Sequence, residues 1–365
     1  MKRRQVVKAL GVGALAAGAL SACSERKPSA EHSRSKVIEW TMVTTWPKNF
    51  PGLGTGANFL AELIQQMSGG RLRVKVYGAN ELVGALEVFD TVAAGRAQMG
   101  HGAAYYWRDK SRAAQFFAAV PFGLTAQEMN AWLYRGGGMT LWEEVYAPFG
   151  LVPTAAGNTG AQMGGWFNRE IRAVEDLQGL KMRIPGLGGE VLRRAGGVPV
   201  LLPGGEIFPA LQSGAIDATE WVGPYNDLAF GLHKAARYYY YPGWHEPGTT
   251  LECLINRAAL EALPADLQSL VRNACRVANQ DMLADFTAKN NAALKQLMDE
   301  QGAELRRFPD AVLRTLKALS AQVLAEEAAA DPLAAKVYQA FQRFREQAMA
   351  WHALSEQAYL EARQL

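Results

Sequence analysis

The segment from Val37 to Ala94 changes its hydrophobic period repeatedly, and this pattern restricts the fold more than any other feature of the chain. Residues 37–43 form a strand-like run, and residues 59–67 carry apolar side chains at the spacing of one helix face. Residues 72–76 alternate apolar and basic side chains, as in a half-buried strand, before a second helical stretch at about 82–94. This order predicts an α/β domain whose strands are largely parallel.

A second domain of similar construction follows. The pattern of residues 89–98 recurs at 208–217, and in both segments a helical stretch stops at a glycine, Gly95 or Gly214, before a short strand. Residues 258–305 and 308–365 are rich in Ala, Leu, Gln and Glu, which predicts a mainly helical C-terminal part. Its last segment either packs on its own domain or pairs with a second copy of the chain. The candidate apolar contacts there are Val337, Phe341, Phe344, Met349 and Trp351.

The first 22 residues have the features of an export signal. A basic start precedes a mostly small and apolar stretch, residues 9–22, whose 14 residues fall short of the roughly 20 that a spanning helix needs. Arg3 and Arg4 resemble a twin-arginine signal, and residues 20–23 resemble a lipobox in which Cys23 is lipidated after cleavage. A plain secretory signal with a basic start is the alternative. Residues 24–36 are read as a flexible tether after Cys23.

The charge balance excludes two classes of partner. The whole chain has 38 basic and 35 acidic residues, and removal of the four basic residues of the leader leaves 34 against 35. A nearly neutral chain has no electrostatic footprint for nucleic acid or for an anionic membrane surface.

The three cysteines and five scattered histidines of the chain supply neither a disulfide framework nor zinc-ligand spacing. Cys253 and Cys275 are therefore read as buried free thiols, with a disulfide formed after export as the alternative.

Two stretches of the second domain carry polar side chains typical of a small-molecule site. Asn158 and Gln162 are neutral amides in a glycine-rich segment, which either brings the backbone close to a ligand or forms an ordinary turn. Arg183 lies on an otherwise apolar strand, and a charge held there must be paired. Because a guanidinium matches a carboxylate, its partner is either an acid ligand or an internal salt bridge. In the first case we expect the protein to leave Arg183 unpaired until the acid arrives.

Two acids near tryptophans follow. Glu220 precedes Trp221 at a predicted strand end, which offers a cation ligand beside a flat apolar wall. Glu246 comes shortly after Trp244 and a run of four tyrosines, residues 238–241, that is more typical of a buried strand than of a binding site.

Longer stretches of the chain match a known family. These segments are residues 46–51, 121–124, 176–186 and 210–221. They resemble the extracytoplasmic solute-binding proteins of tripartite ATP-independent periplasmic (TRAP) transporters, and the similarity extends over roughly residues 37–340. The surroundings of Asn158 and Glu220 are most similar to the subgroup that binds 2-oxo and 2-hydroxy monocarboxylates together with a cation.

The resemblance implies an α/β fold of the periplasmic-binding-protein type. This fold is a two-domain clamp with mixed sheets, a long interdomain helix and a helical C-terminal tail. The implied boundaries are residues 37–157 and about 249–285 for domain I, 158–248 and about 286–330 for domain II, and 331–365 for a C-terminal helix suited to dimerisation.

The resemblance also implies roles for individual residues. Arg183 matches the arginine that pairs with the substrate carboxylate, and Asn158 hydrogen-bonds the ligand. The residues that line the substrate site are Tyr105, Tyr106 and Trp107 from domain I, and Trp221 from domain II.

A cation site is implied beside the substrate. Its ligands are Gln162, Glu220, the carbonyl oxygen of Trp221, and Glu246. Two carboxylates together with the acid's own favour Ca²⁺, a hard cation that takes 6 to 8 oxygen ligands. Na⁺ is the alternative.

The function expected from the sequence is capture of a small acid in the periplasm, followed by delivery to membrane permease subunits. Lipidated Cys23 is expected as an anchor. One rival is an exported metal-dependent enzyme in which Glu220 or Glu246 is the acid or base, and another is a ligand-binding module for a sensor. Neither a Gly-x-Ser-x-Gly elbow nor a His-Glu-x-x-His pair supports an enzyme.

Overall fold

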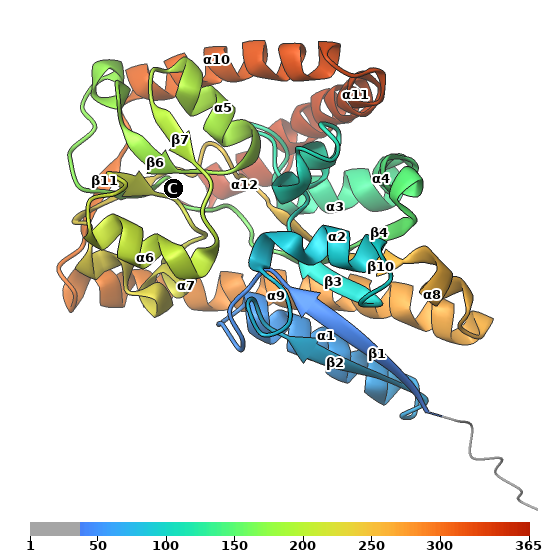
Figure 1. Cartoon of the computed structure of the whole chain (residues 1–365). Helices are drawn as coiled ribbons and strands as arrows, with labels where there is room; N and C mark the ends of the chain where they lie inside the picture. The colour runs from blue at the N-terminus through green and yellow to red at the C-terminus, as the bar shows by residue number, and fades with distance from the viewer. Residues whose placement is uncertain (1–36) are drawn as a thin grey trace, which may run out of the picture. The chain divides into compact units, whose positions relative to one another are not determined.

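The computed structural model describes residues 37–365 of the chain. The predictions for residues 1–36 lie outside the described residues: the export signal, the tether and the lipidation of Cys23. Two β-sheets with helices on their faces form the described part (Figure 1).

The first sheet, sheet A, confirms the α/β reading of the N-terminal segment. Its strand order is β2-β1-β3-β10-β4, and β1 is parallel to both β2 and β3. The expectation of largely parallel strands is wrong for the other half of the sheet. There β10, which begins at Thr250 far along the chain, lies between β3 and β4 and is antiparallel to both. The strands are β1 (Ile38–Thr44), β2 (Leu72–Tyr77), β3 (Met99–Gly102), β4 (Leu151–Asn158) and β10 (Thr250–Asn256).

The second sheet, sheet B, is also mixed. Its order is β11-β9-β5-β8-β6-β7, in which β5 is antiparallel to β8 and β9 while the other neighbours are parallel. The tyrosine run forms β9, as its composition predicted. The strands are β5 (Gly165–Phe167), β6 (Lys181–Arg183), β7 (Val198–Val200), β8 (Ala218–Thr219), β9 (Tyr238–Tyr241) and β11 (Glu304–Arg307).

The helices follow the predicted pattern, with one shortened element. The stretch expected at about 82–94 is helical only from Ala85, as a 3-10 turn that continues into α2. Gly95 and Gly214 follow α2 and α6, where the helices were predicted to stop, with φ of 71° and 75°, a left-handed conformation that glycine adopts readily. The helices are α1 (Leu53–Met67), α2 (Val88–Ala93), α3 (Ala126–Arg135), α4 (Gly138–Tyr146), α5 (Gly186–Arg194), α6 (Gly204–Gln212), α7 (Pro224–Phe230), α8 (Arg257–Glu261), α9 (Ala265–Asp299), α10 (Asp310–Ala329), α11 (Pro332–Leu354) and α12 (Glu356–Ala362).

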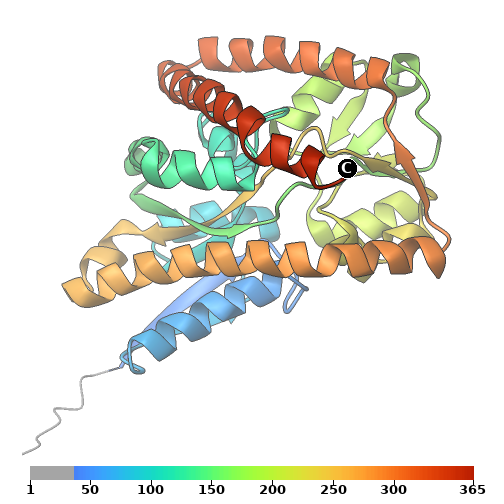
Figure 2. The same ribbon diagram turned by 180° about the vertical axis from the view of Figure 1, so that it is seen from behind.

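The helix α9 connects the two sheets. Over its 35 residues it contacts α1 and β4 of the sheet A side and α7 beside sheet B. Figure 2 shows it extending across the molecule from the sheet A side to the sheet B side. This is the long interdomain helix of a two-domain clamp.

The C-terminal helices also contact both halves. The helix α10 packs on α5, whereas α11 packs on α3 and α4. Val337 and Phe341 are buried there, and the Phe341 ring meets Trp132 edge-on. The first part of the tail therefore packs on its own chain, while Met349 and Trp351 remain exposed.

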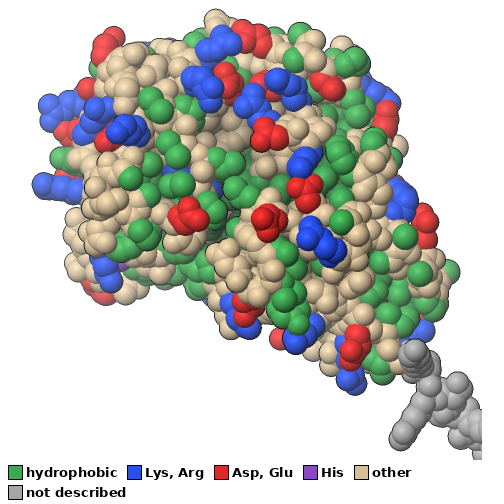
Figure 3. Space-filling view, viewed as in Figure 1, with side chains coloured by type: hydrophobic (Ala, Val, Ile, Leu, Met, Phe, Trp, Pro, Cys, Tyr) green, Lys and Arg blue, Asp and Glu red, His purple; other side chains and the backbone are tan. Residues whose placement is uncertain are grey.

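The described residues contain free thiols at Cys253 and Cys275, both buried. None of the helices within residues 37–365 has the length and apolarity needed to cross a bilayer. On the face shown in Figure 3, acidic and basic side chains are interspersed, in agreement with the balanced composition.

Candidate functional site

Charged side chains from three segments meet at the carboxyl ends of β6 and β8, the edge of sheet B at which these two strands end. Arg183 ends β6 and lies opposite Thr219 of the parallel strand β8, which Glu220 directly follows. Since parallel neighbours end at the same edge, Arg183 and Glu220 are adjacent. The loop between β9 and β10 brings Glu246 to the same place, where its carbonyl accepts the backbone N–H of Gln162 at 3.1 Å.

Arg183 is almost completely buried, with 1% of its surface exposed. Its Nη1 forms an ion pair with Glu220. Its Nη2 donates to Tyr106 Oη at 3.2 Å, and its Nε donates to the carbonyl of Leu202 at 3.2 Å. The guanidinium lies over the Trp221 ring, 5.2 Å from the centroid.

This ion pair corrects the expectation that the protein leaves Arg183 unpaired. The strand register brings Glu220 beside the guanidinium, and removing a charge from water without a partner costs several kcal/mol. Within the chain, Glu220 therefore takes the place expected for the carboxylate of a ligand.

Glu220, His245 and Glu246 form a buried cluster whose potential ligand atoms lie within 4.8 Å of one another. Burial raises the pKa of Glu220 to about 7, although the charge of Arg183 opposes the rise. Burial, followed by the charge of Glu220, raises the pKa of Glu246 to about 7. Burial lowers the pKa of His245 to about 4, so its ring is neutral at neutral pH. Sequence reasoning missed His245, although it is adjacent to Glu246 in the chain.

The two amides of the site differ in how fully the chain satisfies them. Gln162 donates from Nε2 to the hydroxyls of Thr159 and Thr249, at 3.1 and 3.2 Å, while its buried Oε1 has no hydrogen-bond partner among residues 37–365. Asn158 accepts the Gly160 N–H at 2.8 Å and is itself fully buried. Of the two, Gln162 has the oxygen available for a ligand.

Aromatic residues of the 3-10 turn Ala104–Trp107, which follows β3, form the wall of the site opposite Arg183. Tyr106 contacts Arg183 through its hydroxyl, and Tyr105 packs so closely on Gly186 that a Cβ there would lie 2.9 Å from the Tyr105 Cβ. Trp107 does not share this position. Its indole N–H donates to Glu252 and its ring packs on Phe89. Trp107 therefore lies behind the wall and supports it instead of lining the site.

A small cavity of about 10 Å³, roughly the space that one water molecule needs, adjoins the cluster. Sequence reasoning missed part of its lining, although Trp46 belongs to one of the family segments. The lining residues are Trp46, Leu53, Tyr105, Tyr106, Thr159, Gln162, Trp221, Val222 and Leu251.

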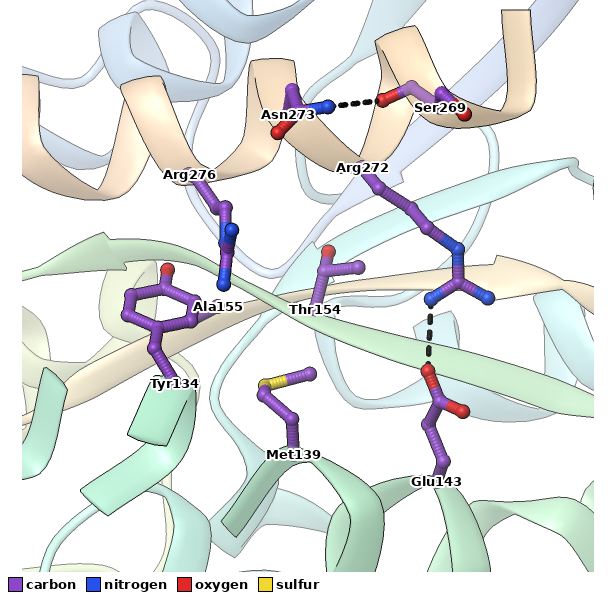
Figure 4. A pocket seen from close by; sticks show the side chains of 9 residues that line it. All are labelled: Tyr134, Met139, Glu143, Thr154, Ala155, Ser269, Arg272, Asn273 and Arg276. Carbon is purple, nitrogen blue, oxygen red and sulfur yellow. Dashed lines mark hydrogen bonds and ion pairs between the residues drawn. The ribbon is translucent and has the colours of Figure 1, made fainter. Parts of the chain in front are cut away.

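A larger hollow of about 320 Å³ lies elsewhere, between α9, β4 and the helices α3 and α4 (Figure 4). There Arg272 is paired with Glu143 at 2.8 Å, and Arg276 lies over the Tyr134 ring. None of the site residues predicted from the sequence lines it. Its lining residues are Tyr134, Met139, Glu143, Thr154, Ala155, Ser269, Arg272, Asn273 and Arg276.

The cluster at the edge of sheet B has the chemistry of an oxygen-bound cation site. Two carboxylates and the free amide oxygen of Gln162 are oxygen donors, which hard cations such as Ca²⁺ prefer. The neutral ring of His245 adds no charge that would repel a cation.

Comparison with known proteins identifies the family. Residues 42–331 match the model of the bacterial extracellular solute-binding proteins, family 7 (DctP). The chain belongs to this family. Its fold is accordingly that of the TRAP periplasmic binding proteins, and the expected two-domain clamp with mixed sheets is confirmed.

Individual relatives are similar over nearly the whole chain. A protein of Nostoc sp., named monocarboxylate 2-oxoacid-binding periplasmic protein, is 44% identical over 359 residues, which are 98% of each chain. A TRAP periplasmic solute binding protein of Pseudoalteromonas atlantica, solved with sodium and pyruvate, is 45% identical with a TM-score of 0.87, covering 89% of this chain and 99% of its own. Another from Colwellia psychrerythraea, solved with calcium and pyruvate, is 43% identical with a TM-score of 0.87, covering 90% and 100%.

Proposed function

We propose that this protein is the solute-binding subunit of a TRAP transporter and captures a small 2-oxo or 2-hydroxy monocarboxylate together with a cation. The observation that carries the proposal is the buried cluster of Arg183, Glu220, Glu246 and the unpartnered Gln162 oxygen. Relatives solved with pyruvate and a cation support this assignment.

Arg183 binds the carboxylate of the acid. We propose that the carboxylate of the acid replaces Glu220 at the guanidinium, so that acid binding releases Glu220 from its ion pair. Tyr106 stays beside the guanidinium through its hydroxyl, and Tyr105 completes the wall. Asn158 orients the ligand through its amide N–H group, whose contacts with Gly248 and Thr250 are long at 3.4 Å, and Trp221 covers the guanidinium.

The released Glu220 joins Gln162, Glu246 and the Trp221 carbonyl as a cation ligand. A cation bound there neutralises carboxylates that would otherwise repel the acid. The two glutamates and the acid carry three negative charges against one positive charge on Arg183, so a divalent cation brings the sum to zero. We therefore favour Ca²⁺ over Na⁺ at this site.

Capture requires the clamp to close on the acid. The ligand stabilises the closed state through contacts that form only there, and membrane permease subunits then take the ligand from this state. The domain boundaries proposed from the sequence place Arg183 and the cation ligands Gln162, Glu220 and Glu246 in domain II, with the wall at 105–107 in domain I.

The protein acts in the periplasm, in keeping with its family of extracellular solute-binding proteins. We propose export by the twin-arginine route and anchoring through lipidated Cys23. Metabolic labelling with palmitate tests the anchor: label on the wild type and none on Cys23→Ala is expected, and equal label on both contradicts it.

The exposed end of the C-terminal helices is proposed as a contact with a second copy of the chain. Met349, Trp351, Leu354 and Tyr359 leave 50%, 64%, 79% and 65% of their surfaces exposed on α11 and α12. Such a concentration of apolar surface is typical of an interface. Sedimentation velocity should show a dimer for the wild type and a monomer for Trp351→Glu, and a monomeric wild type contradicts the proposal.

Binding without turnover separates the transporter subunit from the rival enzyme. Pyruvate and lactate should each raise the melting temperature, because a ligand that binds only the native state stabilises it by mass action. The acid should be recovered unchanged after prolonged incubation with Ca²⁺, whereas product formation favours the enzyme. Uptake of labelled pyruvate by vesicles that contain the permease subunits then distinguishes transport from sensing.

A further inference from the structure

Trp46 lines the cavity of the candidate site, although it is far from Arg183 and the cation ligands in the sequence. It lies in the loop after β1 with 2% of its surface exposed. Its ring centroid is 6.2 Å from that of Trp221 and 6.3 Å from that of Tyr106. Both of these residues touch the Arg183 guanidinium, so Trp46 stands directly behind the contacts of the acid-binding arginine.

A buried histidine holds the Trp46 indole. Trp46 Nε1 donates to His101 Nδ1 at 2.8 Å, and His101 Nε2 lies 3.3 Å from the carbonyl oxygen of Ala156 on β4. His101 is fully buried, and burial lowers its pKa to about 4. A neutral ring that accepts at Nδ1 and donates at Nε2 satisfies both contacts, which fixes its tautomer.

The position of His101 makes this a rigid support. It lies on β3 opposite Thr44 of β1 and Cys253 of β10, in the interior of sheet A. The cavity wall that Trp46 forms is thus bonded to the central strands of the sheet. If the indole moved, a buried imidazole nitrogen would lose its donor, which is unfavourable.

The rest of the cavity leaves a longer ligand little alternative space. Beside Trp46, the apolar lining consists of Leu53, Val222 and Leu251, all buried. Tyr106 and Trp221, which contact Arg183, also line this cavity, so an acid whose carboxylate is on Arg183 can extend its tail toward it. A methyl group nearly fills the cavity, whereas a longer tail must displace a lining side chain such as the Trp46 indole.

We infer that Trp46 is the specificity-determining residue that restricts the ligand to short-chain 2-oxo acids, and that His101 is the positioning residue that holds its indole. The inference rests on the proposed function and adds the size class of the substrate. It assigns a role in selectivity to a histidine that contacts neither the acid nor the cation.

Calorimetric titration with pyruvate, 2-oxobutyrate and 2-oxohexanoate in saturating Ca²⁺ tests this inference. The wild type should bind pyruvate at least about 100-fold more tightly than 2-oxohexanoate, since a misfit of even one methylene group costs about 10- to 200-fold. Trp46→Leu should reduce this ratio to below about tenfold, mainly through stronger binding of the longer acid. Trp46→Phe keeps an aromatic ring without the N–H and should give an intermediate ratio.

The histidine variants separate positioning from a general loss of stability. His101→Leu removes the acceptor and should lower the selectivity ratio, while His101→Gln retains an amide oxygen that accepts the indole N–H and should restore most of it. Trp40→Leu is the matched control, because Trp40 is a buried tryptophan of β1 that belongs to a different apolar cluster. It should lower the melting temperature and leave the ratio unchanged.

The outcomes distinguish this inference from the proposed function. A wild type that binds no 2-oxo acid contradicts the proposed function itself. A wild type that binds pyruvate, with the same ratio in Trp46→Phe and His101→Leu as in the wild type, overturns the inference alone. An equal loss of the ratio in Trp40→Leu also overturns it, because the effect would then follow stability.

Discussion

Among residues 37–365, the four most deeply buried carboxylates divide into two pairs with different partners. Glu220 and Glu246 lie in the candidate site, whereas Glu252 lies on β10 and Asp227 on α7, and each has at most 3% of its surface exposed. Burial is the main cause that raises the pKa of all four to about 7. The difference between the pairs is therefore not their depth but the groups that satisfy them.

Glu252 and Asp227 are satisfied within the chain by neutral donors. Glu252 accepts from the indole of Trp107 and from Tyr146 Oη at 2.8 Å. Asp227 accepts from the Trp166 indole at 3.1 Å and from Tyr239 Oη at 2.6 Å. Each of these two carboxylates is thus held by one tryptophan and one tyrosine, and both belong to the scaffold.

The carboxylates of the site have a charged partner or a less complete set of donors. Glu220 depends on Arg183, and Glu246 accepts from the Thr249 hydroxyl at 2.6 Å. The comparison shows that a buried acid is a candidate for function when its partners are charged or incomplete, and that burial alone is a poor guide.

The largest effect is expected from Arg183→Met. Acid binding should weaken by about 30- to 5,000-fold, because loss of one partner of a buried charged pair costs about 2–5 kcal/mol. Calorimetry with pyruvate measures the loss, and circular dichroism checks the fold. Arg194→Met, at an exposed position, is the control. Wild-type affinity in Arg183→Met would place the acid elsewhere.

Glu252→Leu should affect stability instead of binding. It leaves the buried Trp107 and Tyr146 donors without an acceptor, at about 1–3 kcal/mol for each, so we expect a loss of about 3–4 kcal/mol in the free energy of unfolding. Urea denaturation measures it. Glu252→Gln, whose amide can accept from one donor, should recover at least half. A stable Glu252→Leu protein that no longer binds pyruvate would erase the distinction between the two pairs.

The pH dependence of stability gives a second view of Glu252. Its pKa is about 7 in the folded protein and ordinary, near 4.5, when unfolded. The folded state therefore binds more protons between these values, and stability falls as the pH rises from about 4.5 to 7. Relative to Glu252→Gln, the wild type should lose up to about 3 kcal/mol over this range. Parallel pH profiles of the two proteins would show that Glu252 does not titrate this way.

Glu246→Gln should act on the cation. Loss of one carboxylate ligand should weaken Ca²⁺ binding by at least about tenfold, since even indirect partners of a metal contribute about 10- to 100-fold. The measurement is the Ca²⁺ concentration that gives half-maximal pyruvate binding. Asp227→Asn is the control, because the carboxylate it removes belongs to the scaffold. An unchanged Ca²⁺ requirement in Glu246→Gln would remove this residue from the cation site.

The smallest effect is expected from an exposed ion pair. Arg194 and Glu326 are joined at the surface between α5 and α10, with 41% and 55% of their side chains exposed. Arg194→Ala should change the free energy of unfolding by less than about 0.5 kcal/mol, because water and salt screen such pairs. A loss above about 2 kcal/mol in urea denaturation would show that the buried pairs are not a distinct class.

The local elements of the fold could be predicted because their signals are local. The apolar stripe of α1, the alternation in β2 and the glycines after α2 and α6 are each contained in a few neighbouring residues. The position of β10 could not be found this way. Its antiparallel pairing with β3 and β4 joins segments separated by roughly 100 residues or more, and no short pattern encodes such a pairing.

The sequence predicted which residues form the site, but it did not predict how those residues contact one another. Resemblance to the family pointed to Arg183, Glu220 and Glu246, which the structure brings together. The pairing of Arg183 with Glu220 depends on the register of β6 and β8, which the sequence does not display. His101 was missed for a similar reason, since its partner Trp46 is 55 residues away.

The most direct test of the central claim is titration of pyruvate into the purified protein under three conditions. These are a sodium-free buffer with EDTA, the same buffer with Na⁺, and a buffer with Ca²⁺. We expect one acid bound per chain in Ca²⁺ and a large loss of affinity after chelation, because Glu220 and Glu246 then oppose the incoming carboxylate. Equal affinity under all three conditions, or no binding under any, would contradict the account.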